Sequence, residues 1–285
     1  MADRAANNLV LDIKGERWVS YPAGMKFPRS FAANYPFRGR GAVSCALYWL
    51  HLVGLDKLTL KWVDPPAIAS RFGFDVAFFW PSKIRSSSRF YGYGVKDGRV
   101  VEYIKLTTDE AEKLILEREA KNTIRAAEIA NYLFQVPRVL GVQEDGSVFA
   151  VRYQPLPEDA QFCPLTDDWI ARARDARRKI AASGYVHGDF AWHNFKAAGE
   201  KLWILDWEEM RKSDNCLVDE ITLEYGLAYY WQHTSIENVM AAFRAEYGGD
   251  AKLRAKAKEA VDDLARRKIT MGDVLEKALV EGGWM

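Results

Sequence analysis

The sequence predicts an α+β protein with two unequal lobes, in which a small antiparallel sheet with one long helix precedes a mainly helical part. Three observations predict this class. Short apolar segments and turn residues alternate over residues 84–153, around a single helical stretch. The connector Gln154–Pro157 then interrupts the pattern with two prolines. From about Val218 the chain looks helical, and Ala251–Leu279 is rich in Ala, Leu, Lys, Arg and Glu, which favour helices.

The expected organisation has three parts. Residues 84–154 form the sheet-containing N-lobe, and residues 155–285 form the helical C-lobe. Residues 1–83 form an N-terminal extension that we expect to pack on the N-lobe. Within this extension the run Phe74–Trp80 is short and apolar and lies between Gly73 and Pro81, which predicts a strand.

The N-lobe is expected to contain two hairpins and one helix. The segments 89–95 and 100–106 are rich in β-branched and aromatic residues, and the intervening Asp-Gly pair is typical of a hairpin turn. A helix is predicted from Thr108 to about Tyr132, with Thr or Asp as its cap. Two further strands are predicted on either side of Glu144-Asp-Gly146.

The C-lobe is expected to begin with one helix, Leu165–Ser183, with Gly184 at the position of a C-terminal cap. A short strand at Tyr185 then enters a loop. Another short strand, Lys201–Leu205, ends at Asp206.

Charge and composition limit the classes of partner. The chain has 40 basic and 39 acidic residues and a net charge of +1, which gives no global signal for nucleic acid. The three cysteines have neither metal-binding nor disulfide spacing. The best apolar stretch, Val43–Leu55, is shorter than the roughly 20 residues that span a bilayer, and no signal peptide is recognised. We therefore expect a cytoplasmic protein without a membrane span or a nucleic-acid partner.

Two segments carry the candidate chemistry, His187-Gly-Asp-Phe-Ala-Trp-His-Asn194 and Leu205-Asp-Trp-Glu208. Phosphoryl transfer requires a hydroxyl group oriented toward the γ-phosphate and neutralisation of the phosphate charge. A carboxylate at Asp189 can orient and deprotonate the hydroxyl. The amide oxygen of Asn194 and the carboxylate of Asp206 are hard ligands that suit Mg²⁺. A hairpin would bring Asp206 beside the first segment.

These segments resemble the H-G-D-x-x-x-x-N catalytic loop and the D-W-E metal segment of the aminoglycoside phosphotransferase and choline kinase-like family, in the protein-kinase-like superfamily. The resemblance implies a protein-kinase-like fold. It also implies that Asp189 is the catalytic base or orients the hydroxyl, that Asn194 and Asp206 bind magnesium, and that His187 organises the loop. The stretch Val218-Asp-Glu220 resembles a downstream acidic element of this family, usually a structural position.

The N-lobe supports the same resemblance over roughly residues 84–220. Tyr103-Ile-Lys-Leu-Thr107 resembles the strand whose lysine, here Lys105, pairs with the α- and β-phosphates. Leu116-Glu-Arg-Glu-Ala120 resembles the helix whose glutamate orients that lysine, and the family pattern assigns Glu119 rather than Glu117. Independently of the family, a lysine on a strand needs a carboxylate that holds it extended and charged.

The remaining nucleotide contacts are expected at two places. Ser86, Ser87 and Ser88 stand where the family has a Gly-rich loop, and serine can offer backbone N–H and hydroxyl groups to phosphate. The adenine is expected near Arg152-Tyr-Gln154, with Gln154 as the backbone donor because Pro155 has no N–H. ATP with Mg²⁺ is the expected nucleotide, and GTP is the alternative.

The acceptor side is expected to be compact. Only about thirty residues separate Leu156 from His187, which leaves room for one helix, whereas many small-molecule kinases of this family carry extra helices there. The acceptor pocket is therefore expected to be small, or to be built from the C-terminal helices or residues 1–83. We predict phosphoryl transfer to a hydroxyl of a small molecule such as a sugar, an amino alcohol or an antibiotic-like compound.

Three alternatives stay open at this point. A compact atypical protein kinase would suit the short insert. A pseudokinase that keeps the fold only for binding is disfavoured by the complete set of Lys, Glu, Asp, Asn and Asp. Transfer of a nucleotidyl group instead of a phosphoryl group would use the same residues with an inverted nucleotide. Outside the motifs, His193 is expected to be an exposed loop residue, and the Arg-rich stretch 172–178 a solvated helix face.

Overall fold

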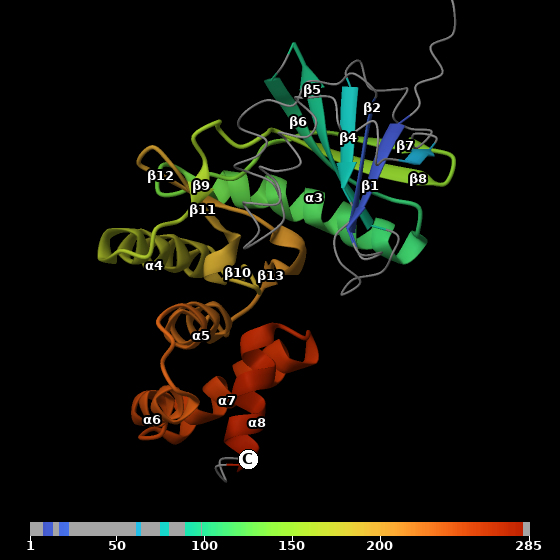
Figure 1. Cartoon of the computed structure of the whole chain (residues 1–285). Helices are drawn as coiled ribbons and strands as arrows, with labels where there is room; N and C mark the ends of the chain where they lie inside the picture. The colour runs from blue at the N-terminus through green and yellow to red at the C-terminus, as the bar shows by residue number, and fades with distance from the viewer. Residues whose placement is uncertain are drawn as a thin grey trace, which may run out of the picture. The chain divides into compact units, whose positions relative to one another are not determined.

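The computed structural model describes residues 8–13, 17–22, 61–63, 75–79, 89–97 and 99–281. Its first part is an eight-stranded sheet with one long helix (Figure 1). The strands are β1 Asn8–Ile13, β2 Arg17–Pro22, β3 Lys61–Val63, β4 Asp75–Phe79, β5 Arg89–Lys96, β6 Arg99–Thr107, β7 Val139–Asp145 and β8 Val148–Tyr153. The helix is α3, Glu110–Ala130.

Every neighbouring pair of strands in this sheet is antiparallel, in the order β3-β1-β2-β4-β5-β6-β8-β7. The strands of residues 8–79 therefore continue the same sheet, with β4 paired to β5. The two predicted hairpins are present. Lys96 pairs with Arg99 across a turn in which Asp97 has a φ of 51°, and Gly146 has a φ of 57° between β7 and β8.

Two residues separate the end of β6 from helix α3, and a side chain caps the first turn of the helix. The carboxylate of Asp109 accepts the N–H of Glu112 at 3.0 Å, which satisfies one of the unpaired donors of the first turn. Leu116 and Ala120 of α3 are buried against Phe149 and Val151 of β8. This apolar contact fixes the helix to the sheet at the level of β6, the strand that carries Lys105.

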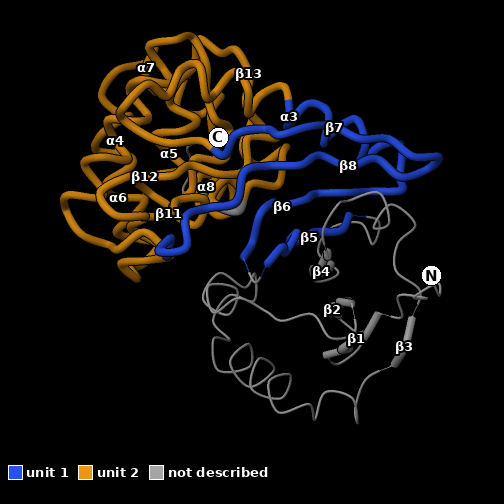
Figure 2. The backbone as a smooth tube through the Cα atoms, turned by 90° about the horizontal axis from the view of Figure 1, so that it is seen from above, with its two compact units in different colours: residues 1–120, 137–161 blue, residues 121–136, 162–285 orange. Residues whose placement is uncertain are grey.

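The chain divides into two compact units (Figure 2). The first contains residues 1–120 and 137–161, and the second contains residues 121–136 and 162–285. The division passes through α3, whose first half belongs to the first unit and whose second half belongs to the second.

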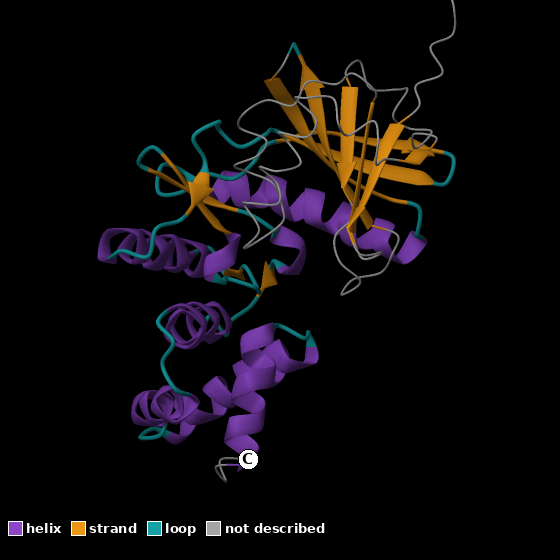
Figure 3. Ribbon diagram, in the orientation of Figure 1, coloured by secondary structure: helices purple, strands orange, loops and turns teal. Residues whose placement is uncertain are grey.

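The second unit is mainly helical (Figure 3). Its helices are α4 Asp167–Ala182, α5 Leu217–Gly226, α6 Ile236–Tyr247, α7 Ala251–Arg266 and α8 Thr270–Glu281, and a π-helical turn, η5 Leu227–Trp231, follows α5. Its short strands are β9 Gln161–Phe162, β10 Tyr185–Val186, β11 Phe195–Ala198, β12 Lys201–Ile204 and β13 Arg211–Lys212. Two 3₁₀ turns, η3 Trp192–Asn194 and η4 Trp207–Glu209, flank the β11–β12 hairpin. The predicted α+β class is confirmed, with an antiparallel sheet in the first part and mainly helices in the second.

Two apolar clusters form the interior of this unit. One surrounds the loop between β10 and β11 and contains Phe190, Phe195 and Trp207. The other joins α5 to α8 and contains Phe243 and Leu264. The chemical motifs thus lie in a loop that is packed on an apolar cluster, which restricts their motion.

The Arg-rich stretch of α4 links two helices. Arg174 binds Glu224 of α5 at 2.6 Å, and Arg177 binds Glu220 of α5 at the same distance. Arg172 binds Asp168 on its own helix. We expected a solvated face here, and Arg174 is indeed 47% exposed. Arg177 is only 14% exposed, because its side chain reaches Glu220 of α5.

Among the residues that the structure describes, no helix is long and apolar enough to cross a membrane. The apolar stretch Val43–Leu55 and the expected phosphate contacts Ser86, Ser87 and Ser88 lie outside the described residues.

Candidate active site

A buried carboxylate, that of Asp219, binds the backbone of the loop that carries Asp189. Asp219, in the first turn of α5, accepts the backbone N–H of His187 at 2.6 Å and that of Gly188 at 2.8 Å. Its side chain is 2% exposed. Burial raises the pKa of Asp219, while His187, the two backbone N–H groups and Arg211 act in the opposite direction. The carboxylate therefore fixes the backbone immediately before Asp189.

His187 connects the two predicted segments through both ring nitrogens. Its Nδ1 accepts the backbone N–H of Asp189 at 3.3 Å, and its Nε2 lies 3.0 Å from the carbonyl oxygen of Leu205. The ring is buried beside Trp207, with 4.5 Å between the ring centroids. Burial is the largest cause of a lowered pKa, so the imidazole is neutral and can accept at Nδ1 while it donates at Nε2. Leu205 directly precedes Asp206, so this ring joins the two halves of the site.

Asn194 holds the side chain of Asp189. Its Nδ2 donates to the backbone oxygen of Asp189 at 2.9 Å and to the carboxylate Oδ2 at 3.2 Å. The amide nitrogen is thus directed at Asp189, and the amide oxygen is an acceptor of the kind that binds a cation. Asn194 is 6% exposed, at the end of η3.

Asp206 lies beside this loop because of a hairpin register. Strand β11 pairs with β12 so that Phe195 faces Ile204, and the N–H of Leu205 donates to the carbonyl of Asn194 at 3.0 Å. The next residue, Asp206, has a φ of 65° and a ψ of 65°, a left-handed conformation that aspartate tolerates better than most residues. The turn redirects the chain into η4, which Asn122 of α3 holds through the carbonyls of Trp207 and Met210, both at 2.9 Å.

Two further side chains of this unit lie close to the site. Glu208 is 5% exposed, and one of its carboxylate oxygens lies within 4.8 Å of one of Asp206. His193 is about one-third exposed, and its Nε2 is 3.8 Å from Oδ2 of Asp189. The sequence left the place of Glu208 open and took His193 for an exposed loop residue. The structure puts the first next to Asp206 and the second next to Asp189.

In the first unit, Lys105 and Glu119 form a buried ion pair. Nζ of Lys105 lies 2.6 Å from Oε1 of Glu119, and the two side chains are 9% and 3% exposed. Lys105 is on β6, next to Tyr91 of β5, and Glu119 is on α3. The carboxylate that reaches the lysine is Glu119 rather than Glu117. A buried lysine must be matched by a carboxylate in this way, since an unpaired buried charge is strongly unfavourable.

The predicted adenine donor is engaged elsewhere. The backbone N–H of Gln154 donates to the carbonyl of Arg138 at 2.7 Å. The reason is that the pairing between the β7 and β8 segments continues beyond Tyr153, which pairs with Val139. The sequence pattern showed that Pro155 lacks a donor but could not show which acceptor Gln154 would meet.

The oxygen groups of Asn194, Asp206 and Glu208 are of the kind that a hard divalent cation takes. Asn194 follows Asp189 on the same loop, and carboxylate oxygens of Asp206 and Glu208 lie within 4.8 Å of each other. Oxygen donors of this kind suit Mg²⁺, which takes one or two carboxylates and keeps water and phosphate oxygens as its other ligands.

Sequence reasoning did not find every residue that shapes the site. Asp219 was recognised only as part of a family element, and its hold on the catalytic loop became visible through two hydrogen bonds. A charged residue within the apolar run of α5 was the available signal. Arg211 on β13, Asp263 on α7 and Arg267 at the end of α7 gave no signal, because charged residues at such positions are ordinary.

No protein-family model matches the chain, and no curated protein matches its sequence. Among the solved structures that are similar to it are the following three. A thermostable mutant of aminoglycoside phosphotransferase APH(4)-Ia, in ternary complex with ADP and hygromycin B, has 12% identity and a TM-score of 0.47, over 70% of this chain and 89% of that one. Monomeric WbdD has 16% identity and a TM-score of 0.36 over 47% of this chain and 35% of that one. WbdD in complex with a kinase inhibitor has 13% identity and a TM-score of 0.41, over 62% and 44%.

The chain spans about a third of the length of monomeric WbdD.

Proposed function

We propose that this chain is a magnesium-dependent kinase that transfers the γ-phosphoryl group of ATP to a hydroxyl group of a small-molecule acceptor. The observation that carries the proposal is the fixed position of Asp189. Its backbone N–H is bound by His187, and its carboxylate by Asn194. A carboxylate held in this way can receive a proton without first having to be oriented.

Asp189 acts on the acceptor hydroxyl. Its carboxylate orients the hydroxyl and takes its proton as the oxygen attacks the γ-phosphorus, while the bond from that phosphorus to the β–γ bridging oxygen breaks and ADP leaves. Asn194 keeps the carboxylate in place during the step. His187 stays neutral and links the loop to Leu205, so it serves as a structural bridge and not as the base.

Two sets of residues are proposed to neutralise the charge of the phosphates. Asn194 and Asp206, with Glu208 near Asp206, would hold Mg²⁺, which would neutralise charge on the phosphate oxygens. Lys105, kept extended by Glu119, is proposed to bind the α- and β-phosphates. One helix, α4, lies between the connector and the catalytic loop, which supports a small acceptor pocket.

Thermal denaturation of the full chain tests whether nucleotide binding depends on Mg²⁺. It is measured with ATP, GTP or ADP, each in the presence of Mg²⁺ and in the presence of EDTA. Binding to the folded state raises its stability by about 2.7 kcal/mol at a nucleotide concentration of 100 Kd. We expect the Tm to rise with ATP only when Mg²⁺ is present, and the rise to disappear in Asp206→Ala. The absence of any shift at millimolar nucleotide would contradict the proposal.

Asp189→Ala is the matched variant, because it removes the proposed base but leaves Asn194 and Asp206. It should keep the Mg²⁺-dependent shift and lose transfer by about 10²-fold to 10⁴-fold. The product mass separates the remaining alternatives, since a phosphoryl group adds far less mass than a nucleotidyl group. A product found on protein and on no sugar or amino alcohol would favour a protein kinase.

A further inference from the structure

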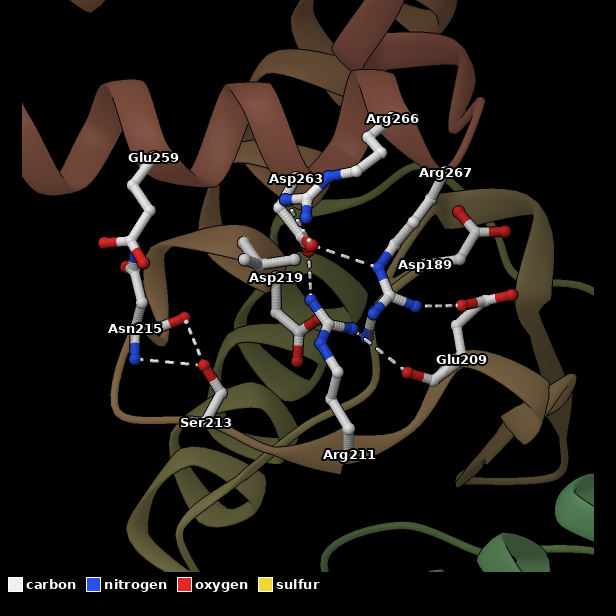
Figure 4. Close-up of polar contacts among 12 residues, drawn as sticks. Asp189, Glu209, Arg211, Ser213, Asn215, Asp219, Glu259, Asp263, Arg266 and Arg267 are labelled. Atoms are coloured by element: carbon white, nitrogen blue, oxygen red, sulfur yellow. Dashed lines mark hydrogen bonds and ion pairs between the residues drawn. The ribbon is translucent and has the colours of Figure 1, made fainter.

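Four charged side chains link the end of helix α7 to residues 209–211, which follow the proposed metal ligand Asp206 (Figure 4). Arg211 binds Asp263 of α7 and donates to the backbone oxygen of Glu209 at 3.1 Å. Arg267, at the end of α7, binds the carboxylate of Glu209 and lies 3.1 Å from Asp263. The contacts close a ring that runs from Arg211 through Asp263 and Arg267 to Glu209 and back.

Two members of the ring, Glu209 and Arg211, lie very close to the catalytic loop at Gly188. This residue has a φ of 88°, and a Cβ placed on it would lie 2.5 Å from the backbone oxygen of Glu209 and 2.7 Å from Nη1 of Arg211. The loop therefore passes so close to the ring that only glycine fits. Strand β13 reinforces the contact, since Arg211 pairs with Val186, the residue before His187.

The ring is partly buried and balanced in charge. The side chains of Arg211 and Asp263 are 24% and 17% exposed, and those of Arg267 and Glu209 are 30% and 21% exposed. Burial lowers the pKa of Arg211, and Asp263, Asp219 and Glu209 oppose this effect. Removing one member would leave partly buried charges without their partners, which disturbs neighbouring backbone more than the loss of an exposed pair does.

We propose that Asp263 and Arg267 are positioning residues for the catalytic loop, which act through Arg211 and Glu209 to hold Gly188 and thereby Asp189. For its effect on catalysis this inference rests on the proposed kinase function. Glu209 is three residues after Asp206, so the same two side chains of α7 also hold the end of the turn that begins at the proposed metal ligand. A helix far along the chain thus sets the geometry of both motif segments.

Hydrogen–deuterium exchange of the full-length chain tests the positioning role without nucleotide or acceptor. In Asp263→Asn and in Arg267→Gln, we expect exchange of the His187 and Gly188 amides to rise by about tenfold. The matched controls lie on the same helix. Asp262→Asn removes an ion pair with Lys258, which is not a member of the ring. Arg266→Gln removes a side chain that is 72% exposed and whose contact with the ring is to Asp263. Both controls should exchange as the wild type does.

A second measurement follows phosphate release from ATP with water as the acceptor. We expect Asp263→Asn and Arg267→Gln to lower the kcat by about tenfold or more and to leave the KM for ATP unchanged, because a misplaced base is costly even when the substrate binds. A purely structural role would lower the Tm and keep the kcat of the folded protein. Exchange in the loop equal to that of Asp262→Asn would overturn the inference. Faster loop exchange with no nucleotide binding by the wild type would sustain the positioning role and refute the proposed function.

Discussion

At the scale of single residues, the site depends on side chains that bind two groups at once. His187 accepts from Asp189 and donates to Leu205, and Asp219 accepts from two consecutive backbone N–H groups. A neutral imidazole can be donor and acceptor together, which neither a carboxylate nor an ammonium group can do. These bonds make the position of Asp189 a property of its neighbours.

His187 should make the stability of the protein sensitive to acid. Burial lowers its pKa in the folded state below the value of about 6.5 for an exposed histidine. The unfolded chain therefore binds one more proton below pH 6.5, and the free energy of unfolding falls there by up to about 1.4 kcal/mol per pH unit until the folded pKa is reached. Above pH 6.5 this contribution is complete.

The measurement is urea denaturation of the wild type and of His187→Gln at pH 7.5 and pH 5.5. Glutamine keeps one donor and one acceptor but does not titrate. We expect a smaller loss of unfolding free energy between the two pH values in the variant than in the wild type. Equal losses in the two proteins would show that His187 does not carry this acid sensitivity.

At the scale of elements, the close pairing of α7 and α8 depends on one glycine. A Cβ on Gly272 would lie 2.4 Å from the backbone nitrogen of Ala265 and 2.5 Å from the backbone carbon of Leu264. These atoms belong to the last turn of α7, between Asp263 and Arg267. The end of α7 is therefore placed both by this contact and by the ion pairs of the ring.

Gly272→Ala should destabilise the protein by about 1–3 kcal/mol, the range for a side chain that does not fit a packed contact. Gly249→Ala is the matched control, because a Cβ there would meet nothing within 4 Å. Thermal or urea denaturation measures both. A Gly272→Ala variant as stable as Gly249→Ala would mean that α8 can shift without cost, and that the end of α7 is not fixed by this contact.

At the scale of the whole molecule, the proposed functional residues are divided between two units. Lys105 and Glu119 belong to the first, and Asp189, Asn194 and Asp206 belong to the second. Each group is fixed within its own unit, by the packing of α3 on β8 in one case and by the clusters around the catalytic loop in the other. Disturbing one group should therefore leave the local order of the other intact.

Glu119→Gln tests this separation. Loss of one partner of a buried ion pair is expected to cost about 3–5 kcal/mol, and hydrogen exchange should increase in β6 and the first half of α3. The loop at His187 should exchange as in the wild type. Glu128→Gln, which removes an exposed pair with Arg125 on the same helix, should cost no more than about 1 kcal/mol. Faster exchange in the loop of Glu119→Gln would show that the two groups are coupled.

The sequence alone identified the elements and the chemical segments. Turn residues and alternating apolar positions predicted both hairpins of the first unit, and the predicted helix from Thr108 corresponds to α3, Glu110–Ala130. The segments with Asp189 and Asn194 on one loop and Asp206 at the end of the next strand resemble those of a phosphotransferase family, which is the basis for proposing phosphoryl transfer. These features are local, so periodicity and motif spacing are enough to reveal them.

Only the tertiary structure decided which groups hold that chemistry in place. The hold of Asp219 on the loop, the ring through Asp263 and Arg267, and the engagement of the Gln154 N–H by Arg138 all join residues that are distant in sequence or lie on different elements. The sequence does not distinguish a carboxylate or guanidinium group that faces solvent from one that binds a partner inside the folded chain. The physical reason is that the partner of a polar group is set by packing, and packing is a property of the folded chain.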